Sequence, residues 1–299
     1  MDTNEYLQSV LSGQSLGEDS AELKELQAER AKVEKLIRES FGSVPIIRYG
    51  GSKAKGSLIK ESYDLDIVCY LPSESDAAGK TLQEIYENIR NCLNKSYYVE
   101  EKTSALRLKG NAADNYMRDF HIDVVPGRFT DESKSDCFIY QKSAEKCRLK
   151  TNLDTHIAHV KGSGVVDAIR LLKLWKTRKG LRVKQFVFEL LIIDLLSGMK
   201  SKPLADQLLH VWNEIADHEE PIHVEDPANP NGNDLTDVMT TVWATLRVAA
   251  TDTLNTIKWS GWEAVFGSVA AAKSFTVAER AQRATASVST PNRPWCPRG

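Results

Sequence analysis

Aspartates interrupt two segments of this chain that otherwise have the composition of buried strands. Residues 64–71 and 120–125 are rich in branched and aromatic side chains, yet the first carries Asp64 and Asp66 and the second carries Asp123. Side chains two residues apart in a strand point to the same face, so Asp64 and Asp66 project together. Two carboxylates on one face repel each other and destabilise a fold unless a cation lies near them. The pattern therefore predicts a sheet with one acidic, cation-binding face.

The alternation of the second strand allows Asp123 to join that face. Phe120, Ile122 and Val124 share one side of their strand, and Asp123 lies on the other side. If the two strands are neighbours, Asp123 supplies a third carboxylate. Carboxylate oxygens select Mg²⁺ or Mn²⁺, and three of them suit two ions roughly 4 Å apart. We therefore expect a two-metal site held by these three aspartates.

A glycine-rich turn precedes the first aspartates. Gly51 and Ser52 follow an expected strand at residues 45–49, and eleven residues separate Ser52 from Asp64. Glycine lets backbone amides approach phosphate oxygens closely, and Ser52 adds a hydroxyl. Taken singly, such a turn is often only a turn, and an aspartate pair in a strand is often a solvated pair. Their order along one chain favours a site that handles phosphates.

The spacing of apolar residues divides the chain into an α+β part and a helical part. Residues 20–41 have the period of a long amphipathic helix, with Ser20 as its N-cap and Gly42 at its end. Further strands are expected at 105–109 and at 120–125, the latter stopped by Pro126 and Gly127. The expected later helices span residues 80–95, 165–177, 186–199, 204–215 and 235–249.

This order predicts an α+β fold with a mixed sheet, packed on a carboxyl-terminal helical lobe. We place the catalytic lobe, with the amino-terminal helix, at residues 1–160, the helical lobe at 161–284 and a tail at 285–299. Trp175, Trp212 and Trp243 lie among apolar residues at helical spacing, and we expect them in the core rather than as platforms for bases.

Charge and cysteine content narrow the class of protein. The formal net charge is −2, so no global basic field argues for wrapping nucleic acid. The five cysteines are odd in number and form no paired metal-binding motif, which favours a reducing compartment. The most apolar run, residues 186–196, contains Glu189 and Asp194 and is too polar to span a bilayer. We therefore expect a cytoplasmic protein with no membrane partner.

The motifs together resemble those of the polymerase-β-like nucleotidyltransferase superfamily. Gly51-Ser52 followed by Asp64-Leu65-Asp66 is similar to its signature. Residues 170–176 and 183–191 resemble helical-lobe motifs of oligoadenylate synthases and of the bacterial cyclic-GMP-AMP-synthase-like (cGAS/DncV-like) enzymes, the CD-NTases. Residues 225–233 resemble the Asp-Pro loop of the same group. The resemblance runs from about residue 45 to 235 and implies a polymerase-β-like core with the helix at 20–41 as its spine.

The resemblance also implies roles for single residues. Asp64, Asp66 and Asp123 would bind two Mg²⁺ or Mn²⁺ ions, and Asp123 would help deprotonate the attacking hydroxyl. Nucleotide contacts would come from Gly51, Ser52, Lys173, Gln185 and Phe186, with Phe186 stacking on a base or, equally, belonging to the core. Members of the family often have Ser where this chain has Gln185. The Asp-Pro loop also fits a helix-entry turn capped by Asp and Asn, and we assign it no catalytic role.

As a function, the resemblance implies a cyclase that makes a cyclic or short linear oligonucleotide second messenger from NTPs, ATP among them, in bacterial antiphage defence of the CBASS type. Its partners would be a downstream effector that reads the product and an activator. The carboxyl-terminal Gly299 suits conjugation to another molecule. Two alternatives remain: a transferase that adds nucleotides to tRNA or another acceptor, and a non-catalytic, antitoxin-like relative. The length after residue 250 leaves little room for an RNA-binding domain, and the three carboxylates weigh against the non-catalytic relative.

Overall fold

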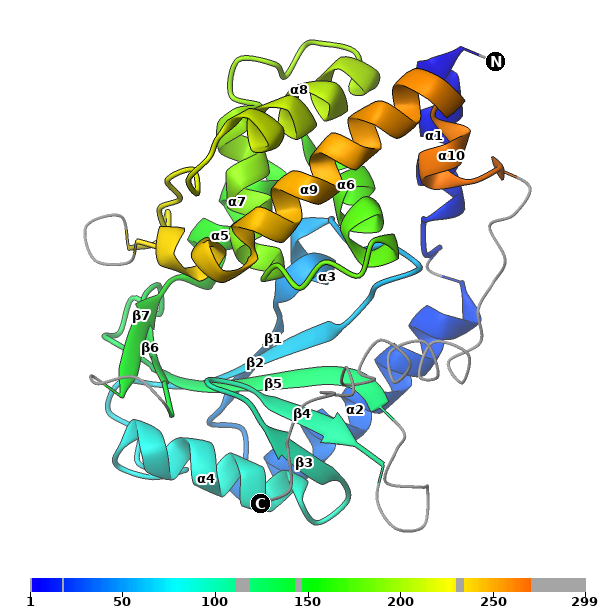
Figure 1. Cartoon of the computed structure of the whole chain (residues 1–299). Helices are drawn as coiled ribbons and strands as arrows, with labels where there is room; N and C mark the ends of the chain where they lie inside the picture. The colour runs from blue at the N-terminus through cyan, green and yellow to red at the C-terminus, as the bar shows by residue number, and fades with distance from the viewer. Residues whose placement is uncertain (1, 18, 111–118, 143–146, 230–233, 270–299) are drawn as a thin grey trace, which may run out of the picture.

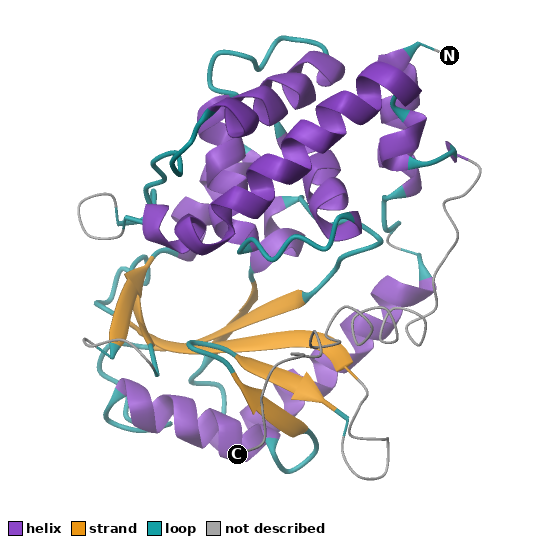
Figure 2. Cartoon of the chain, in the orientation of Figure 1, coloured by secondary structure: helices purple, strands orange, loops and turns teal. Residues whose placement is uncertain are grey.

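The structure is a computed structural model that describes residues 2–17, 19–110, 119–142, 147–229 and 234–269. A twisted sheet lies between two layers of helices, with two helices on one side and a helical lobe on the other (Figure 1). Figure 2 shows that the strands are confined to one half of the molecule and that the other half is helical. This is the α+β arrangement that the sequence predicts. The expected tail, including Gly299, lies outside the described residues.

The sheet is mixed and has seven strands in the described part of the chain. Five strands follow the order β1-β2-β5-β4-β3. The other two branch off this path, since β6 pairs with β5 and β7 pairs with β6. Only β2 and β5 run parallel, and the other pairs are antiparallel. The strands are β1 (Ile46–Tyr49), β2 (Leu65–Leu71), β3 (Tyr98–Glu101), β4 (Leu106–Lys109), β5 (Asp119–Phe129), β6 (Cys137–Tyr140) and β7 (Arg148–Thr151).

The prediction that Pro126 and Gly127 end the fifth strand is wrong. β5 continues to Phe129, with Pro126 opposite Cys69 of β2. On its other side, β4 pairs with β5 up to Val124 and β6 begins to pair at Gly127. Pro126 lies at the changeover between these two partners, where a strand tolerates a residue that has no N–H to donate. The strands β3, β6 and β7 were not predicted; each is only four residues long.

Two helices cover one face of the sheet. They are α2 (Ala21–Phe41) and α4 (Leu82–Leu93), and Figure 1 shows both below the strands. Helix α2 confirms the prediction for residues 20–41: the Ser20 hydroxyl accepts a hydrogen bond from Leu23 N, and Gly42 ends the helix with φ of 65°. Burial of each Leu or Ile side chain stabilises the fold by about 1.5–3 kcal/mol. The core beneath the sheet contains Leu23, Val33, Ile37, Leu65, Ile67, Ile85, Ile89, Ile122 and Val124.

The helical lobe has a second core. Its helices are α5 (Leu153–Lys161), α6 (Val166–Arg178), α7 (Gln185–Leu195), α8 (Leu204–Asp217), α9 (Thr236–Ser260) and α10 (Glu263–Phe266). The expected core positions of Trp175, Trp212 and Trp243 are confirmed, since none exposes more than 2% of its surface. Helix α9 is eleven residues longer at its carboxyl end than the pattern indicates.

A helix at the amino terminus was not predicted and joins this second core. Helix α1 (Thr3–Gly13) begins with a capping box formed by Asp2 and Glu5. Its residues Leu7 and Leu11 are buried with the helical lobe rather than with the sheet. The chain therefore starts in the helical lobe and crosses to the sheet with α2, and the boundaries at 160 and 284 stay a prediction.

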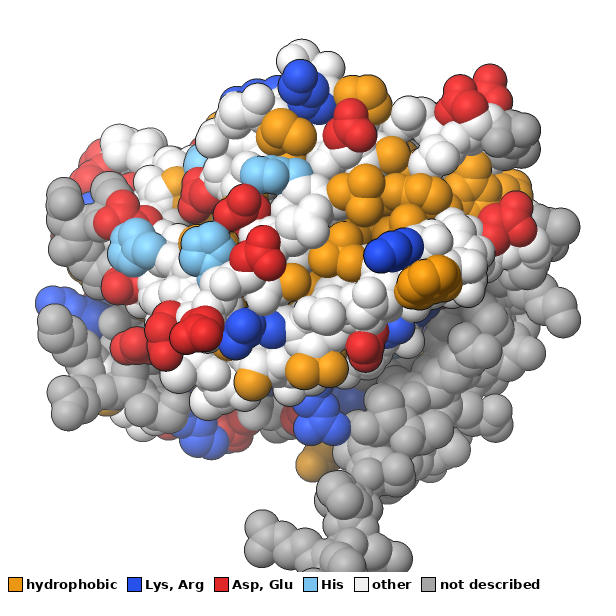
Figure 3. Space-filling view, turned by 45° about the horizontal axis from the view of Figure 1, so that its top comes forward, with side chains coloured by type: hydrophobic (Ala, Val, Ile, Leu, Met, Phe, Trp, Pro, Cys, Tyr) orange, Lys and Arg blue, Asp and Glu red, His pale blue; other side chains and the backbone are white. Residues whose placement is uncertain are grey.

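Helix α9 is buried along one side only. Leu246 and Ala250 are fully buried, whereas Val248 and Trp259 expose 61% and 78% of their surface. Figure 3, which looks onto the helical lobe, shows orange hydrophobic side chains gathered among charged ones on this outer face. Within the described residues, no helix is long and apolar enough to cross a membrane.

Candidate active site

The Gly50–Gly51 turn lies directly against the acidic strand. Gly50 N donates a hydrogen bond of 2.8 Å to Asp66 O, and Gly51 starts the short helix α3 (Gly51–Lys55). A Cβ at Gly51 would lie 1.6 Å from Asp66 Oδ2. The φ of Gly51 is +51°, a backbone conformation that residues other than glycine rarely adopt. Only glycine can therefore bring this backbone so close to the Asp66 carboxylate.

The three predicted aspartates come together as the strand pattern requires. Asp66 and Asp123 are direct partners in the parallel pairing of β2 with β5. Asp64 precedes β2 and is two residues from Asp66, on the same side of the strand. Asp123 is 8% exposed, whereas the side chain of Asp64 is about half exposed, at 46%. The acidic face is thus built from the neighbouring strands β2 and β5, and its third carboxylate, Asp64, lies directly before the start of β2.

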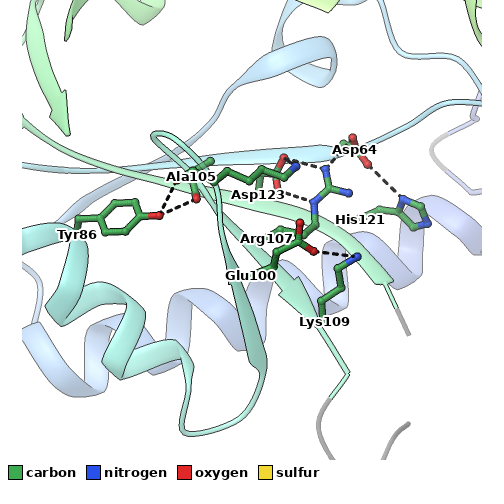
Figure 4. A network of polar contacts seen from close by, with 9 residues as sticks. Asp64, Tyr86, Glu100, Ala105, Arg107, Lys109, His121 and Asp123 are labelled. Atoms are coloured by element: carbon green, nitrogen blue, oxygen red, sulfur yellow. Dashed lines mark hydrogen bonds and ion pairs between the residues drawn. The ribbon is translucent and has the colours of Figure 1, made fainter. Parts of the chain in front are cut away.

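Cations that the sequence analysis did not single out hold two of these carboxylates (Figure 4). Arg107 is the β4 partner of Asp123, and its Nε and Nη2 donate to Asp123 Oδ1 and Oδ2 at 2.5 and 2.8 Å. The same Nη2 is 3.0 Å from Asp64 Oδ2, so one guanidinium bridges two aspartates. Lys102 Nζ is 2.9 Å from Asp123 Oδ2, and His121 Nδ1 is 3.2 Å from Asp64 Oδ1.

These neighbours move the carboxyl pKa values in opposite directions. Burial and then the charges of Asp123 and Asp64 raise the pKa of Asp66 to about 7. For Asp64, burial raises the pKa, but the hydrogen bond with His121 and the charge of Arg107 outweigh it and hold the pKa well below its usual range. Of the two carboxyls, Asp66 therefore has the higher proton affinity.

A cavity of about 340 Å³ joins the acidic face to the helical lobe. Lys173 of α6 is 4% exposed, and its Nζ donates to Ser52 Oγ at 2.9 Å. Burial lowers the pKa of Lys173, and burial together with the charge of Lys173 lowers the pKa of Lys176 to about 8. An anion in the cavity would raise both pKa values again, because a nearby negative charge favours the charged form of a lysine. The cavity is lined by Gly51, Ser52, Lys55, Ser62, Asp64, Asp66, Lys173, Lys176, Gln185, Phe186 and Glu189.

A buried ion pair connects the two lobes at this cavity. Glu189 of α7 is 1% exposed, and its Oε2 is 2.9 Å from Lys55 Nζ of α3. Its Oε1 accepts a hydrogen bond of 2.8 Å from the Ser57 hydroxyl. A buried carboxylate without such partners would cost several kcal/mol. The sequence signal for this residue was an acid within an apolar helix, which we used only to exclude a membrane span.

The remaining predicted contact residues, Gln185 and Phe186, also line the cavity. The Phe186 ring is partly buried against the helical core, with Lys55 Nζ 4.5 Å from its centroid and the ring of His156 at 4.4 Å. Gln185 Nε2 lies 3.3 Å from Glu189 Oε1. The cavity therefore gathers the predicted site residues except Asp123, which lies beside Asp66 in the strand pairing. Near them the structure also places Lys55, Lys102, Arg107, His121, Lys176 and Glu189.

The Asp-Pro loop is hydrogen-bonded to the histidine that lies beside Phe186. Asp226 is 2% exposed and accepts hydrogen bonds from Ala228 N at 2.9 Å and from His156 Nε2 at 2.7 Å. The first contact is the capped turn that the sequence indicates, and the second ties the loop to the histidine that contacts Phe186. Residues 230–233 of this loop lie outside the described residues.

The chemistry of the aspartates suits a hard divalent cation. Across the described ranges, no group of three or more His, Cys, Asp and Glu side chains is placed to bind a metal ion. In Figure 4, Arg107 contacts both Asp64 and Asp123. A cation that enters this site must take carboxylate oxygens from Arg107 and Lys102.

Comparison with known proteins identifies the fold. No protein-family model and no curated protein matches the chain by sequence. Solved structures of CD-NTases match it over 82% to 99% of their own length. CdnC of Escherichia coli MS115-1 with ATP is 18% identical, with a TM-score of 0.63 over 89% of this chain and 99% of that chain. CdnG of Bradyrhizobium diazoefficiens in complex with GTP is 12% identical, with a TM-score of 0.65 over 94% and 98%.

A third match is the cyclic AMP-GMP synthase DncV of Vibrio cholerae, which is 14% identical, with a TM-score of 0.54 over 88% of this chain and 85% of that chain. The chain therefore has the CD-NTase nucleotidyltransferase fold, a mixed sheet with a helical carboxyl-terminal part, as the resemblance of its motifs predicts.

Proposed function

We propose that this chain is a nucleotidyltransferase that joins ribonucleoside triphosphates into a cyclic or short linear oligonucleotide, with ATP among its substrates. One observation carries the proposal. A single cavity gathers Asp64 and Asp66 with Lys55, Lys173 and Lys176, so that carboxylates for cations and ammonium groups for a triphosphate line the same space. Asp123 lies directly beside Asp66 in the pairing of β2 with β5. A pure nucleic-acid-binding module has no need for such a carboxylate set.

Different side chains would serve different steps of an in-line nucleotidyl transfer. A ribose hydroxyl attacks the α-phosphate of a second nucleotide, its proton passes to Asp123, and the bond to pyrophosphate breaks. Lys55, Lys173 and Lys176 neutralise the charge that builds up on the departing phosphates. The Gly51 and Ser52 backbone holds the triphosphate against β2. Two divalent cations bound by Asp64, Asp66 and Asp123 would activate the hydroxyl and bind the triphosphate.

The test is incubation of the purified chain with the four labelled NTPs and Mg²⁺ or Mn²⁺, followed by phosphatase treatment and mass spectrometry. The Asp64→Ala/Asp66→Ala variant serves as the blank. A phosphatase-resistant product that the variant lacks supports the cyclase. Linear products, or label transferred only to added tRNA, would support the acceptor transferase instead. If no NTP, metal or candidate activator yields a product, the non-catalytic relative becomes the better explanation.

We extend the proposal to signalling in bacterial antiphage defence, in which an effector protein reads the oligonucleotide. Phages should form fewer plaques on cells that carry the wild-type gene with its neighbours than on cells that carry the Asp64→Ala/Asp66→Ala variant. Equal plaque counts for every phage tried would separate the chemistry from this role.

Metal affinity should rise with pH up to about 7. The pKa of Asp66 is raised to about 7, so below that value a proton competes with the cation for this carboxylate. Each pH unit below 7 should weaken Mn²⁺ binding about tenfold, because one proton must leave. Titration of Mn²⁺ by electron paramagnetic resonance from pH 5.5 to 8.5 measures this slope. A wild-type affinity that does not change between pH 5.5 and 7 would show that no proton on Asp66 competes with the cation.

Removal of the Arg107 guanidinium should tighten metal binding. Arg107 occupies oxygens of Asp64 and Asp123, and Arg107→Met removes this competing cation while it keeps much of the side-chain volume. We expect Mn²⁺ to bind about tenfold more tightly, which corresponds to about 1.4 kcal/mol of lost competition. The unfolding temperature without metal should fall, because the three carboxylates lose a neutralising partner.

Lys109→Met is the matched control for this prediction. Lys109 lies two residues further along β4 and pairs with Glu100, at 3.4 Å. Its substitution should leave the Mn²⁺ affinity unchanged. An unchanged affinity in Arg107→Met as well would show that the guanidinium does not compete with the metal.

A further inference from the structure

The loop between α3 and β2, residues 56–64, carries two residues to the cavity. Ser62 and Asp64 both line it. Asp66 and Asp123 are placed by the register of two paired strands, whereas the pairing of β2 with β5 begins only after Asp64. The backbone position of Asp64 therefore depends on the contacts that hold the loop before it.

This loop passes from one core of the molecule to the other. Ile59 is fully buried in the core of the helical lobe, and Tyr63 is buried in the core beneath the sheet. An isolated bridge pairs Ile59 with Ser62, so the chain makes a narrow turn between them. Glu61 lies in this turn, a few residues before Asp64. A displacement of the turn therefore reaches Asp64 through a very short stretch of backbone.

The carboxylate of Glu61 is held by Arg178, the last residue of α6. Arg178 Nε donates to Glu61 Oε2 at 2.9 Å, and its Nη2 donates to Glu61 Oε1. Arg178 Nη1 donates to Phe266 O of α10. Because two parallel hydrogen bonds to a carboxylate fix the plane of a guanidinium, and α10 holds its other end, the direction in which Arg178 holds Glu61 is well defined.

A second group of contacts ties the same turn to α1. Gln14 is 3% exposed, and its Nε2 donates to Glu61 Oε1 at 2.7 Å. Gln14 Oε1 accepts from Glu61 N at 3.1 Å, and Gln14 O accepts from Lys60 N at 2.9 Å. The contacts of Gln14 are between neutral donors and a carboxylate or carbonyl oxygen, whereas those of Arg178 join opposite charges. The helical lobe thus holds the turn at Glu61 with α1, α6 and α10 together.

We propose that Arg178 is a positioning residue for the transfer. Through Glu61 it holds the loop of residues 56–64 so that Ser62 and Asp64 keep their places at the cavity. Arg178 does not itself line the cavity, so its effect on the reaction passes through the loop. The inference rests on the proposed function, because Asp64 is taken to serve the transfer as a cation ligand.

The first measurement needs neither metal nor nucleotide. Hydrogen exchange of the amides of residues 59–62 reports how firmly the turn is held. In Arg178→Met, which keeps much of the side-chain volume, these amides should exchange about fivefold faster than in the wild type, because the turn loses its charged partner. Glu61→Gln, which keeps the shape of the side chain and removes its charge, should change the exchange in the same direction.

The second measurement follows the consequence for Asp64. In both variants Mn²⁺ should bind about tenfold more weakly, as expected when an outer contact that orients a ligand is lost. The kcat of NTP joining should fall about tenfold or more, because a small misplacement at the reacting groups is costly. KM should change less than about threefold, because Lys55, Lys173 and Lys176 belong to helices and not to the loop.

Arg38→Met is the matched control. Arg38 donates through the same two atoms, Nε and Nη2, to Glu34 at 2.9 and 2.8 Å, but both residues lie in α2 and neither lines the cavity. Its substitution should change neither the exchange of the turn, nor the Mn²⁺ affinity, nor kcat. Thermal unfolding establishes that each variant is folded at the assay temperature.

The outcomes distinguish positioning from stability alone. A lower unfolding temperature with unchanged loop exchange and unchanged Mn²⁺ affinity would mean that Arg178 only stabilises the fold, and the inference would be wrong. If Arg178→Met does not fold, the isosteric Glu61→Gln decides by the same readouts.

The two proposals can fail separately. If the wild type makes an oligonucleotide and both variants keep its kcat and Mn²⁺ affinity, the inference is wrong and the function stands. If the wild type makes no product but its loop exchange and Mn²⁺ affinity depend on Arg178, the proposed function fails, while the positioning of Asp64 is supported.

Discussion

Asp66→Asn should abolish product formation and at the same time stabilise the metal-free protein. Activity should fall by at least about a thousandfold, because a neutral amide cannot hold the cations that contribute several kcal/mol to the transfer. Stability should change in the other direction. The amide removes a charge that faces Asp64 and Asp123, and Gly51 packs directly against this side chain, which the isosteric amide preserves.

The pH dependence gives the sign of that stability change. The folded-state pKa of Asp66 is raised to about 7, above its value in an unfolded chain. A carboxyl with a raised pKa destabilises the fold above its unfolded pKa, and the loss grows with pH until it levels off above about 7. At pH 8 and without metal, the free energy of unfolding of Asp66→Asn should therefore exceed that of the wild type by about 1 kcal/mol after allowance for solvent screening.

Calorimetric unfolding at pH 5 and pH 8, with and without Mn²⁺, measures this effect beside the activity assay. Asp252→Asn, on the exposed side of α9, is the control and should change neither quantity. A variant that is inactive because it is misfolded would unfold earlier at both pH values, which contradicts the prediction. Retained activity would remove Asp66 from the metal-binding set.

Gly51→Ala should have the second largest effect, on both folding and activity. Its Cβ would lie 1.6 Å from Asp66 Oδ2 and 2.5 Å from Asp66 Cγ, so either the turn or the carboxylate must move. Overpacking costs about 1–3 kcal/mol, and the left-handed conformation of a non-glycine residue adds about 1 kcal/mol. Displacement of the turn also moves Ser52, so we expect product formation to fall at least about a hundredfold.

Gly56→Ala separates the clash from the backbone strain. Gly56 has φ of +76° and no heavy atom within 4 Å of its expected Cβ. It should therefore lose only the roughly 1 kcal/mol of conformational strain and keep most of its activity. Chemical denaturation and the NTP assay measure both variants. Equal losses in the two would mean that strain, and not contact with Asp66, makes Gly51 necessary.

Much of the sheet half of the site was predictable because its information is local. The alternation of Asp64, Leu65, Asp66 and Ile67 assigns two carboxylates to one face and two apolar residues to the core, and burial in the structure agrees. The same alternation placed Asp123 on the acidic face. In these strands the period of two is a property of the backbone and needs no knowledge of the neighbours.

The end of β5 shows where local rules fail. Pro126 predicts a stop, yet the strand continues, because a proline is tolerated where one partner strand leaves and another arrives. Which strands flank a residue is set by the topology, and the topology is not written in the residues near Pro126.

The amino-acid sequence by itself determined the α+β order, the amino-terminal helix at 20–41, the acidic face and the glycine turn, because each depends on residues within a few positions of one another. The tertiary structure alone decided which cations meet the carboxylates. Arg107 becomes the partner of Asp123 through strand register, and Lys55 meets Glu189 across 134 residues of chain. Long-range packing also fixes the amide of Gln185 against Glu189. The contacts that bridge the lobes therefore follow from how two separate cores dock, which no local pattern encodes.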